Sequence, residues 1–344
     1  MTTSVQEPSD TVTERDLQQT GASTRRSGGD RPRAAMIVNP YSSGMTGKRE
    51  RLIVSALRER MDLEVRRTER GGHAPKLARE LMAGGDLDVL IACGGDGTAN
   101  EVINGMELAA GTAPDRPALA LVPAGGTNVL ARSIGYPNHP VRATEQLADA
   151  IVAHRVRTIN VATVDERLFL FSAGVGLDAE VVKRMEQRRS GRRPSDAAHI
   201  ASIVGFYATQ RFALRDGMQI EVTGTGEQIR AALVLVGNTT PMTYMGRMPM
   251  HFMPDASLEG GLDFCAPSKA NAGFAIRNAA QAMGIGRSGR RLVSDDKMNL
   301  RHDVQGMTIS CDDAQPVQVD GEYIGDRTHI TFGLLEGAVD LVWS

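Results

Sequence analysis

Asp96 lies in the segment whose residue types most clearly indicate chemistry, ACGGDGTAN at residues 92–100. Three glycines surround this carboxylate, and an apolar run, LDVLI, precedes it at residues 87–91. Glycines allow a backbone to approach a ligand closely, and the free N–H groups at the start of a helix bind phosphate. A carboxylate beside phosphates would hold Mg²⁺ or accept a proton from an attacking hydroxyl group. We therefore predict a phosphate site; the alternative is a tight strand-to-helix turn without a ligand.

The start of the next helix is predicted from Thr98 and Glu101. A threonine followed three residues later by a glutamate is the pattern of a capping box, in which the two side chains satisfy free N–H groups at the beginning of a helix. We therefore expect this helix to begin at Thr98.

Two further segments repeat the order of apolar strand and flexible turn. VPAGGTNVLAR at residues 122–132 contains a Gly-Gly pair, and VNPYSSG at residues 38–44 is rich in glycine and serine. Ligands of open parallel sheets bind at the carboxyl ends of the strands, so three such turns predict one shared site. The sequence has no GxxxxGK[ST] motif, which excludes an ordinary P-loop NTPase. GVGLDA at residues 174–179 matches a nicotinamide-binding fingerprint only weakly, because no compact strand–helix–strand unit surrounds it.

The elements that must position these turns alternate between strand and helix over residues 34–155. Apolar runs predict strands at 34–40, 63–65, 87–93 and 118–124. Helical spacing of apolar residues predicts helices through 53–61, through 77–82, from 98 onward and over about 141–155. This rhythm indicates a doubly wound, mostly parallel sheet.

After this region the pattern changes to short strands with turns between them. Hairpins are predicted around Asp165-Glu166 and around Gly224-Thr225-Gly226, and further strands follow to the end of the sequence. Many short strands with glycine-rich turns are typical of an antiparallel sheet or β-sandwich. We therefore divide the chain into a disordered tail at 1–33, an α/β domain at 34–157 and a mainly antiparallel β-sandwich domain at 158–344.

Composition narrows the class of protein. A chain of 344 residues accommodates two domains, and a net charge of -2 argues against electrostatic binding of nucleic acid. Three widely spaced cysteines indicate neither a zinc site nor a disulfide framework. The sequence shows no apolar run long enough to span a membrane and no signal peptide, so we expect a cytoplasmic protein.

The motifs resemble those of the lipid kinase family that contains the bacterial diacylglycerol kinases and, more distantly, the sphingosine kinases and ceramide kinase. The matching segments are NPYSSG (39–44), TERGGHA (68–74), GGDGTANEVINGM (94–106), PAGGTNVLARSIGYP (123–137) and VDGE (319–322). The fold of this family is similar to that of NAD kinases and phosphofructokinases. The resemblance implies ATP and Mg²⁺ as cofactors, held between a nucleotide-binding α/β domain and a β-rich domain for the lipid substrate.

The resemblance also implies particular residues for the site. Those expected to contact the nucleotide are Asn39, Pro40, Gly44, Thr68, Gly94, Gly95, Gly97, Thr98, Gly125, Gly126, Thr127 and Asn128. Glu322 and Asp96 are the two candidates for the general base, and Asp320 would bind Mg²⁺ or position its neighbours. A plain hairpin turn is the alternative for Asp320-Gly321-Glu322.

Asp178 matches a family aspartate that contacts the hydroxyl group of the acceptor, although a carboxylate at a helix start also stabilises the helix dipole. Some relatives bind a structural metal near an Asp-Gly-Leu turn, where this chain has SLEGGLDF at 257–264. Gly260 stands where that acid would be, and Glu259 or Asp263 would have to replace it. We therefore assign no metal ligands.

Two segments suit a lipid acceptor at a membrane surface. PMTYMGRMPMHFMP at 241–254 contains five methionines, which adapt to irregular apolar shapes. KRMEQRRSGRR at 183–193 is basic and would be attracted to anionic lipid. The alternatives are a methionine-rich core and a solvated loop.

Together with the resemblance, the sequence predicts an ATP-dependent lipid kinase at the membrane periphery, which phosphorylates the primary hydroxyl group of diacylglycerol or a related lipid to give phosphatidic acid. The alternatives are a sphingoid-type kinase or an NAD kinase built on the same loops, and a nucleotide-binding protein without turnover. No nucleic acid partner is expected, and the formation of a homodimer is left open.

Overall fold

The computed structural model describes residues 31–108, 110–113, 116–187, 217–268 and 298–344. The predicted tail therefore lies outside the described residues except for its last three positions. Arg31–Ser344 form one compact unit.

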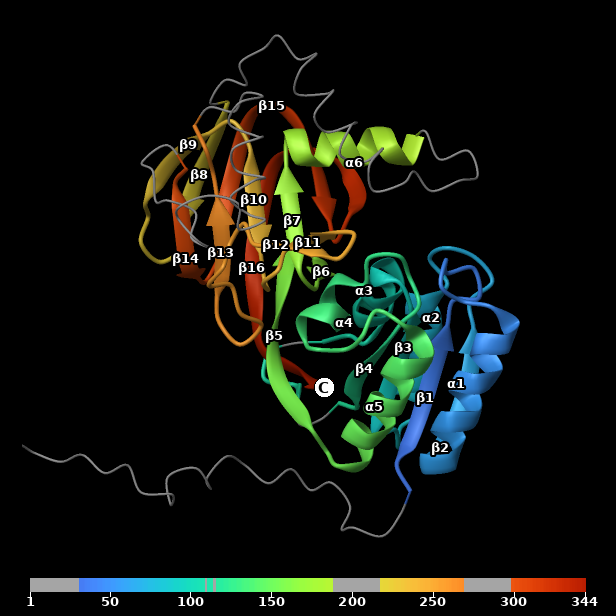
Figure 1. Ribbon diagram of the computed structural model, residues 1–344. Coiled ribbons are helices and arrows are strands. Elements are labelled where there is room, and N and C mark those ends of the chain that lie inside the picture. The colour runs from blue at the N-terminus through green and yellow to red at the C-terminus, as the bar shows by residue number, and fades with distance from the viewer. Residues whose placement is uncertain (1–30, 109, 114–115, 188–216, 269–297) are drawn as a thin grey trace, which may run out of the picture. The chain divides into compact units, whose positions relative to one another are not determined.

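The first half of the described chain is an α/β layer built on four parallel strands in the order β2-β1-β3-β4 (Figure 1). These are β1 (Arg33–Val38), β2 (Asp62–Arg67), β3 (Val89–Gly94) and β4 (Ala118–Pro123). The helices are α1 (Gly47–Arg60), α2 (Ala74–Ala83), α3 (Asp96–Gly105), α4 (Val129–Ser133) and α5 (Pro140–Val152). α1 packs with α5, and α2 packs with α3, which also contacts β3. All six residues of β3 are buried. The predicted α/β fold is confirmed.

The helix predicted to begin at Thr98 starts two residues earlier. α3 begins at Asp96, its N-cap is Gly95, and no side chain caps it. The predicted capping box is therefore wrong, because the carboxylate of Glu101 is used elsewhere. It accepts hydrogen bonds from the backbone N–H groups of Gly72 (2.9 Å) and Ala74 (3.2 Å), which fixes the turn before α2 against α3.

The second half is rich in strands that pair mainly antiparallel and enclose a second apolar core, as the sequence predicted. The strands are β5 (Val156–Val164), β6 (Arg167–Phe169), β7 (Ser172–Val175), β8 (Met218–Val222), β9 (Gln228–Ala231), β10 (Val234–Gly237), β11 (Thr243–Met245), β12 (Met248–Met250), β13 (Leu262–Cys265), β14 (Leu300–Val304), β15 (Met307–Val319) and β16 (Glu322–Val342), with one helix, α6 (Leu177–Gln187). Both predicted hairpins form, as β5–β6 and β8–β9.

Two long strands belong to both halves. In β5, Ile159 contributes to the core of the α/β layer and Val164 to the second core. β16 pairs with β15 in its first part and with β5 from Phe332 to Val342, and it reaches β4 at Leu341. The described strands other than β11 and β12 therefore form one 14-stranded sheet, and β5 and β16 run between the two halves (Figure 1). The boundary predicted between 157 and 158 falls inside β5, and the two halves therefore share backbone hydrogen bonds.

Among the described residues, no helix is both long enough and apolar enough to cross a membrane.

Candidate functional site

The three glycine-bearing turns meet at the carboxyl ends of β1, β3 and β4. The N–H of Gly44 donates to the carbonyl of Ala124 (2.8 Å), and the N–H of Ala124 donates to the carbonyl of Gly94 (2.7 Å). The side-chain amide of Asn39 donates to the hydroxyl oxygen of Thr98 (3.1 Å). The structure thus brings together the turns that the sequence assigned to one site.

Two of the glycines are required by the contact between turns. A Cβ on Gly125 would lie 2.4 Å from Cα of Gly95, and a Cβ on Gly95 would lie 3.1 Å from Cα of Gly125. A Cβ on Gly94 would collide with Thr98. The sequence-based explanation, in which all these glycines make room for a ligand, is therefore corrected: of Gly94, Gly95, Gly97 and Gly125, only Gly97 has no atom within 4 Å of its added Cβ.

This difference predicts separable effects of two alanine substitutions. Gly125→Ala should lower both the melting temperature and the affinity for ATP, because its methyl group must push two backbones apart. Gly97→Ala should leave the melting temperature unchanged or higher, since alanine favours a helix over glycine by about 0.5–1 kcal/mol, yet weaken ATP binding through its methyl group. Thermal unfolding and nucleotide titration measure both effects. Equal ATP affinity in wild type and Gly97→Ala would place the phosphates elsewhere.

Asp96, the first residue of α3, faces the start of α4. Its carboxylate accepts hydrogen bonds from the backbone N–H groups of Val129, Leu130 and Asn128. Burial raises the pKa of Asp96 to about 7, and the nearby Asp320 adds to the rise, whereas the three amides oppose it. Asp96 is thus a fixed carboxyl group that changes its charge near neutral pH.

Other predicted nucleotide residues maintain the shape of the turns. Asn128 has a left-handed backbone (φ 51°), and its side chain bonds to the N–H and the carbonyl of Gly125 (2.8 and 2.9 Å). Thr68 is buried, and its N–H donates to the carbonyl of Val38 (2.9 Å). The carbonyl of Gly126 accepts from Asn138 (3.2 Å).

Arg132 was missed by the sequence prediction, although it is the last residue of the quoted segment VPAGGTNVLAR at 122–132. Its guanidinium donates to the carbonyls of Thr127 (3.3 Å) and Gly246 (3.2 Å). The guanidinium carbon lies 3.3 Å from the ring centroid of Tyr244, in cation–π contact. Burial lowers the pKa of Arg132, against the opposing influence of Tyr244 and Asp96. The contact between Arg132 and Tyr244 joins the glycine turn that follows β4 to the β11–β12 hairpin.

Asp320 ties the strand-rich half to α3. It precedes Gly321 in the β15–β16 turn, where both residues have positive φ (49° and 79°), as two-residue hairpin turns require. Its carboxylate accepts from the side chain of Asn100 (2.7 Å) and from the N–H groups of Leu170 (2.8 Å), Phe171 (3.0 Å) and Ser172 (3.2 Å). These bonds match the roughly four acceptor positions of a carboxylate. Because the N–H groups of Leu170 and Phe171 bond to Asp320, they are not available to a neighbouring strand, and the chain is interrupted between β6 and β7.

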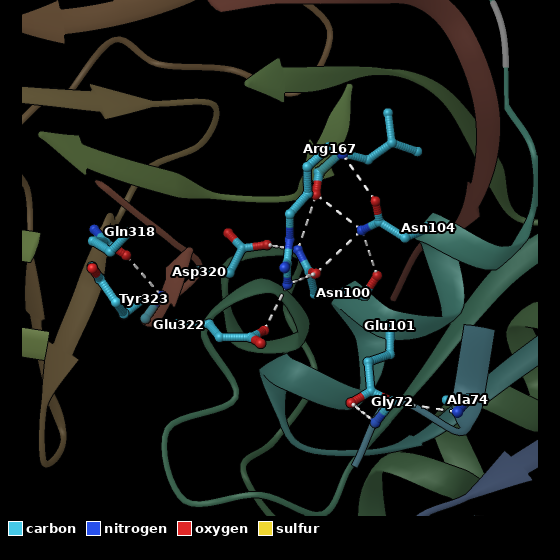
Figure 2. A network of polar contacts seen from close by, with 12 residues as sticks. Gly72, Ala74, Asn100, Glu101, Asn104, Arg167, Gln318, Asp320, Glu322 and Tyr323 are labelled. Carbon is cyan, nitrogen blue, oxygen red and sulfur yellow. Dashed lines mark hydrogen bonds and ion pairs between the residues drawn. The ribbon is translucent and has the colours of Figure 1, made fainter. Parts of the chain in front are cut away.

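Glu322 lies at the beginning of β16, and its side chain is 48% exposed. Its Oε2 accepts from the guanidinium of Arg167 (2.7 Å), which also donates to Oδ1 of Asn100 (3.2 Å). Figure 2 shows Arg167 between these two partners. Neither Arg167 nor Asn100 was among the predicted site residues. Asn100 is the last residue of the glycine segment at 92–100 and could have been suspected, but no sequence signal marks Arg167.

Asp178, in the first turn of α6, lies close to the same β15–β16 turn. Its Oδ2 accepts from the side-chain amide of Gln318 (2.8 Å), whose Oε1 accepts from the N–H of Gly321 (2.9 Å). One side chain thus connects Asp178 to the Asp-Gly-Glu segment.

The methionine-rich and basic segments are only partly available to a lipid. Met242, Met250 and Met253 are buried, whereas Met248 is 42% exposed. In the basic segment, Lys183 is paired with Asp326 (2.7 Å), and residues 188–193 lie outside the described residues. The alternative of a methionine-rich core holds for these three side chains.

The described residues contain no group of three or more histidine, cysteine, aspartate or glutamate side chains arranged to bind a metal. Glu259 pairs with Arg157 (3.5 Å). Asp263 bonds with His302 (2.7 Å) and accepts from the N–H of Asp303 (3.1 Å). Both acids suggested for a structural metal therefore already have protein partners.

Glycine turns at the ends of parallel strands, together with acids at the start of α3 and in the β15–β16 turn, define an enzyme of the phosphotransferase class. Residues 33–164 match the family described as "Diacylglycerol kinase catalytic domain". A diacylglycerol kinase of Staphylococcus aureus is 30% identical over 238 residues, which cover 67% of this chain and 69% of the relative. The chain belongs to the diacylglycerol kinase family, and it is a kinase.

Two further proteins are similar over longer stretches. A diacylglycerol kinase of Bacillus subtilis is 28% identical over 302 residues, which cover 85% of this chain and 90% of the relative. A crystal structure of a diacylglycerol kinase from Bacillus anthracis superposes with a TM-score of 0.67 at 24% identity, covering 92% of this chain and 98% of that chain. At 24% identity, this similarity supports the fold of the chain and not its activity.

Proposed function

We propose that this protein transfers the γ-phosphate of ATP to the primary hydroxyl group of diacylglycerol and so produces phosphatidic acid. The observation that carries the proposal is the junction of the three glycine turns, with Asp96 fixed beside it by three backbone amides. The names of the relatives support diacylglycerol as the acceptor.

In this proposal the start of α3 receives the phosphates. The open space at Gly97 lets the backbone approach them, and the first N–H groups of the helix point toward negative charge. Asp96 suits Mg²⁺, which binds through one or two carboxylates together with substrate phosphates. The ion would neutralise phosphate charge, and Asp96 would hold it there. Asn39, Gly44, Thr98 and Asn128 would maintain the turns around the nucleotide.

We assign the role of base to Glu322, because its carboxylate is partly exposed and belongs to the element that reaches back to α3. It would take the proton of the acceptor hydroxyl as the oxygen attacks the phosphorus. Asp320 would act as a positioning residue, since four hydrogen bonds occupy its carboxylate. Asp178 would contact the acceptor near the same turn.

Diacylglycerol resides in bilayers, so the proposed reaction takes place at a membrane surface, with the enzyme bound peripherally from the cytoplasm. The exposed Met248 in the β11–β12 hairpin is one side chain that could contact lipid.

Labelled Mg-ATP supplied with diacylglycerol, sphingosine, ceramide or NAD tests the acceptor. Label is expected in phosphatidic acid, and the Asp96→Asn variant serves as the inactive control. Label only in the product of sphingosine, ceramide or NAD would replace diacylglycerol by that acceptor. Tight ATP binding without any labelled product would instead favour a nucleotide-binding protein without turnover.

A further inference from the structure

Arg167 joins Glu322, the proposed base, to Asn100 of α3 without belonging to any recognised motif. It is the first residue of β6 and directly follows the β5–β6 turn. One guanidinium nitrogen, Nη2, donates both to Oε2 of Glu322 (2.7 Å) and to Oδ1 of Asn100 (3.2 Å) (Figure 2). Asn100 lies on α3, about one turn after Asp96.

The asparagine that anchors Arg167 has a fixed orientation. Asn100 is 1% exposed, and its Nδ2 donates to Oδ2 of Asp320 (2.7 Å) and to the carbonyl of Leu168 (3.1 Å). Because both donors of the amide are used, its oxygen must face Arg167 and the side chain of Asn104 (3.2 Å). The guanidinium is therefore placed by a rigid buried partner on α3.

The hydrogen bonding of the Arg167 side chain is incomplete. Nε of Arg167 is one of three buried side-chain nitrogen or oxygen atoms without a hydrogen-bond partner among the described residues. A buried donor without a partner destabilises a fold, and such atoms call for an explanation other than stability. The explanation that we consider is that Arg167 holds the carboxylate of Glu322 in place.

Glu322 needs such placement more than the other acids of the site. Its side chain is about half exposed, and within the described chain its only hydrogen-bond partner is Arg167, through Oε2. The opposite oxygen, Oε1, is thus left for a proton from an acceptor. A base that is free to rotate would lose the alignment on which proton transfer depends.

We propose that Arg167 is a positioning residue that orients Glu322 relative to α3 and thereby aligns the base with the phosphates. The inference rests on the proposed function, because it requires Glu322 to act in phosphoryl transfer. It assigns Arg167 an effect on turnover rather than on nucleotide binding.

A double-mutant cycle with Arg167→Met, Glu322→Gln and the combined variant tests this inference in the full chain. Arg167→Met is expected to lower kcat about tenfold or more, with KM for ATP within about twofold of wild type. Glu322→Gln is expected to lower kcat about 10²-fold. The combined variant should be no slower than Glu322→Gln alone, because Arg167 then has no base to orient. Arg167→Lys should recover part of the loss, since an ammonium can pair with Glu322 but lacks the rigid planar group that fixes the donor in place.

Arg60→Met is the matched control, because Arg60 forms an exposed ion pair with Asp149 (3.0 Å) away from the site; its kcat should equal that of wild type. Unchanged kcat in Arg167→Met, or multiplying losses in the combined variant, would overturn the inference. If Arg167→Met does not fold, Arg167→Lys replaces it in the same cycle. The cycle uses whichever acceptor the wild type labels, so a wrong acceptor refutes the proposed function separately.

Discussion

Replacement of Asp96 by asparagine is expected to reduce kcat about 10²-fold or more, the usual size of a lost acid–base group, while the protein still folds. Asparagine has nearly the same shape, and one oxygen still faces the amides at the start of α4. It cannot carry the negative charge that holds Mg²⁺ or accepts a proton. Steady-state kinetics measures the loss, and circular dichroism checks the fold.

The same residue predicts how activity depends on pH. Burial raises the pKa of Asp96 from 3.8 to about 7, so the carboxyl group is mostly protonated below pH 7 and ionised above it. In the proposed mechanism only the ionised form serves the reaction, so kcat/KM should rise between about pH 6 and pH 8. The raised pKa also means that the folded state binds the proton more tightly than the unfolded state. The resulting stability is fully present below about pH 4 and is lost as pH rises through about 7.

Asp62→Asn provides the control, because Asp62 lies at the edge strand β2 and its side chain is 70% exposed. Its turnover and pH profile should match those of wild type. Near-wild-type turnover in Asp96→Asn would remove Asp96 from the mechanism. If kcat/KM of the wild type did not change between pH 6 and pH 8, the ionisation of Asp96 would not control catalysis.

Replacement of Asp320 by alanine is expected to lower the free energy of unfolding by about 3 kcal/mol or more. The change leaves the amide of Asn100 and three backbone N–H groups, those of Leu170, Phe171 and Ser172, without their acceptor. Each buried donor that loses its partner costs about 1–3 kcal/mol, although local rearrangement recovers part of the sum. Urea unfolding measures the change, and activity should fall together with stability.

Asp313→Ala is a matched control on the same strand, β15, because the side chain of Asp313 is exposed and forms no ion pair among the described residues. Its effect should stay within about 0.5 kcal/mol. If Asp320→Ala were as stable as Asp313→Ala yet inactive, Asp320 would act directly on Mg²⁺ or substrate, which is the role that the sequence left open.

The sequence sufficed to locate the glycine turns because their signals are local. Each turn directly follows an apolar run, and parallel strands bring their carboxyl ends to one edge. The purpose of individual glycines could not be predicted in this way. Gly95 and Gly125 contact each other across two loops, and nothing in either segment indicates that its glycine faces backbone rather than ligand.

The partners of the acids were beyond sequence analysis for a related reason. Arg167 and Glu322 are 155 positions apart, and Asn100 and Asp320 are 220 apart. Their pairing depends on how β6 and the β15–β16 turn are placed against α3, which no short-range pattern encodes. Glu101 shows the opposite error, since a valid local pattern predicted a cap, but the long-range contact with Gly72 and Ala74 prevailed.

The path of β16 has a consequence for protein synthesis. Its last residues pair with β5 at Val339 and Leu341, and Leu341 also neighbours Leu119 of β4. During translation, the edge of β4 that faces away from β3 therefore has no strand neighbour from the described residues until residues 339–342 have emerged. An unpaired apolar edge invites aggregation, so a nascent chain is expected to depend on chaperones up to that stage.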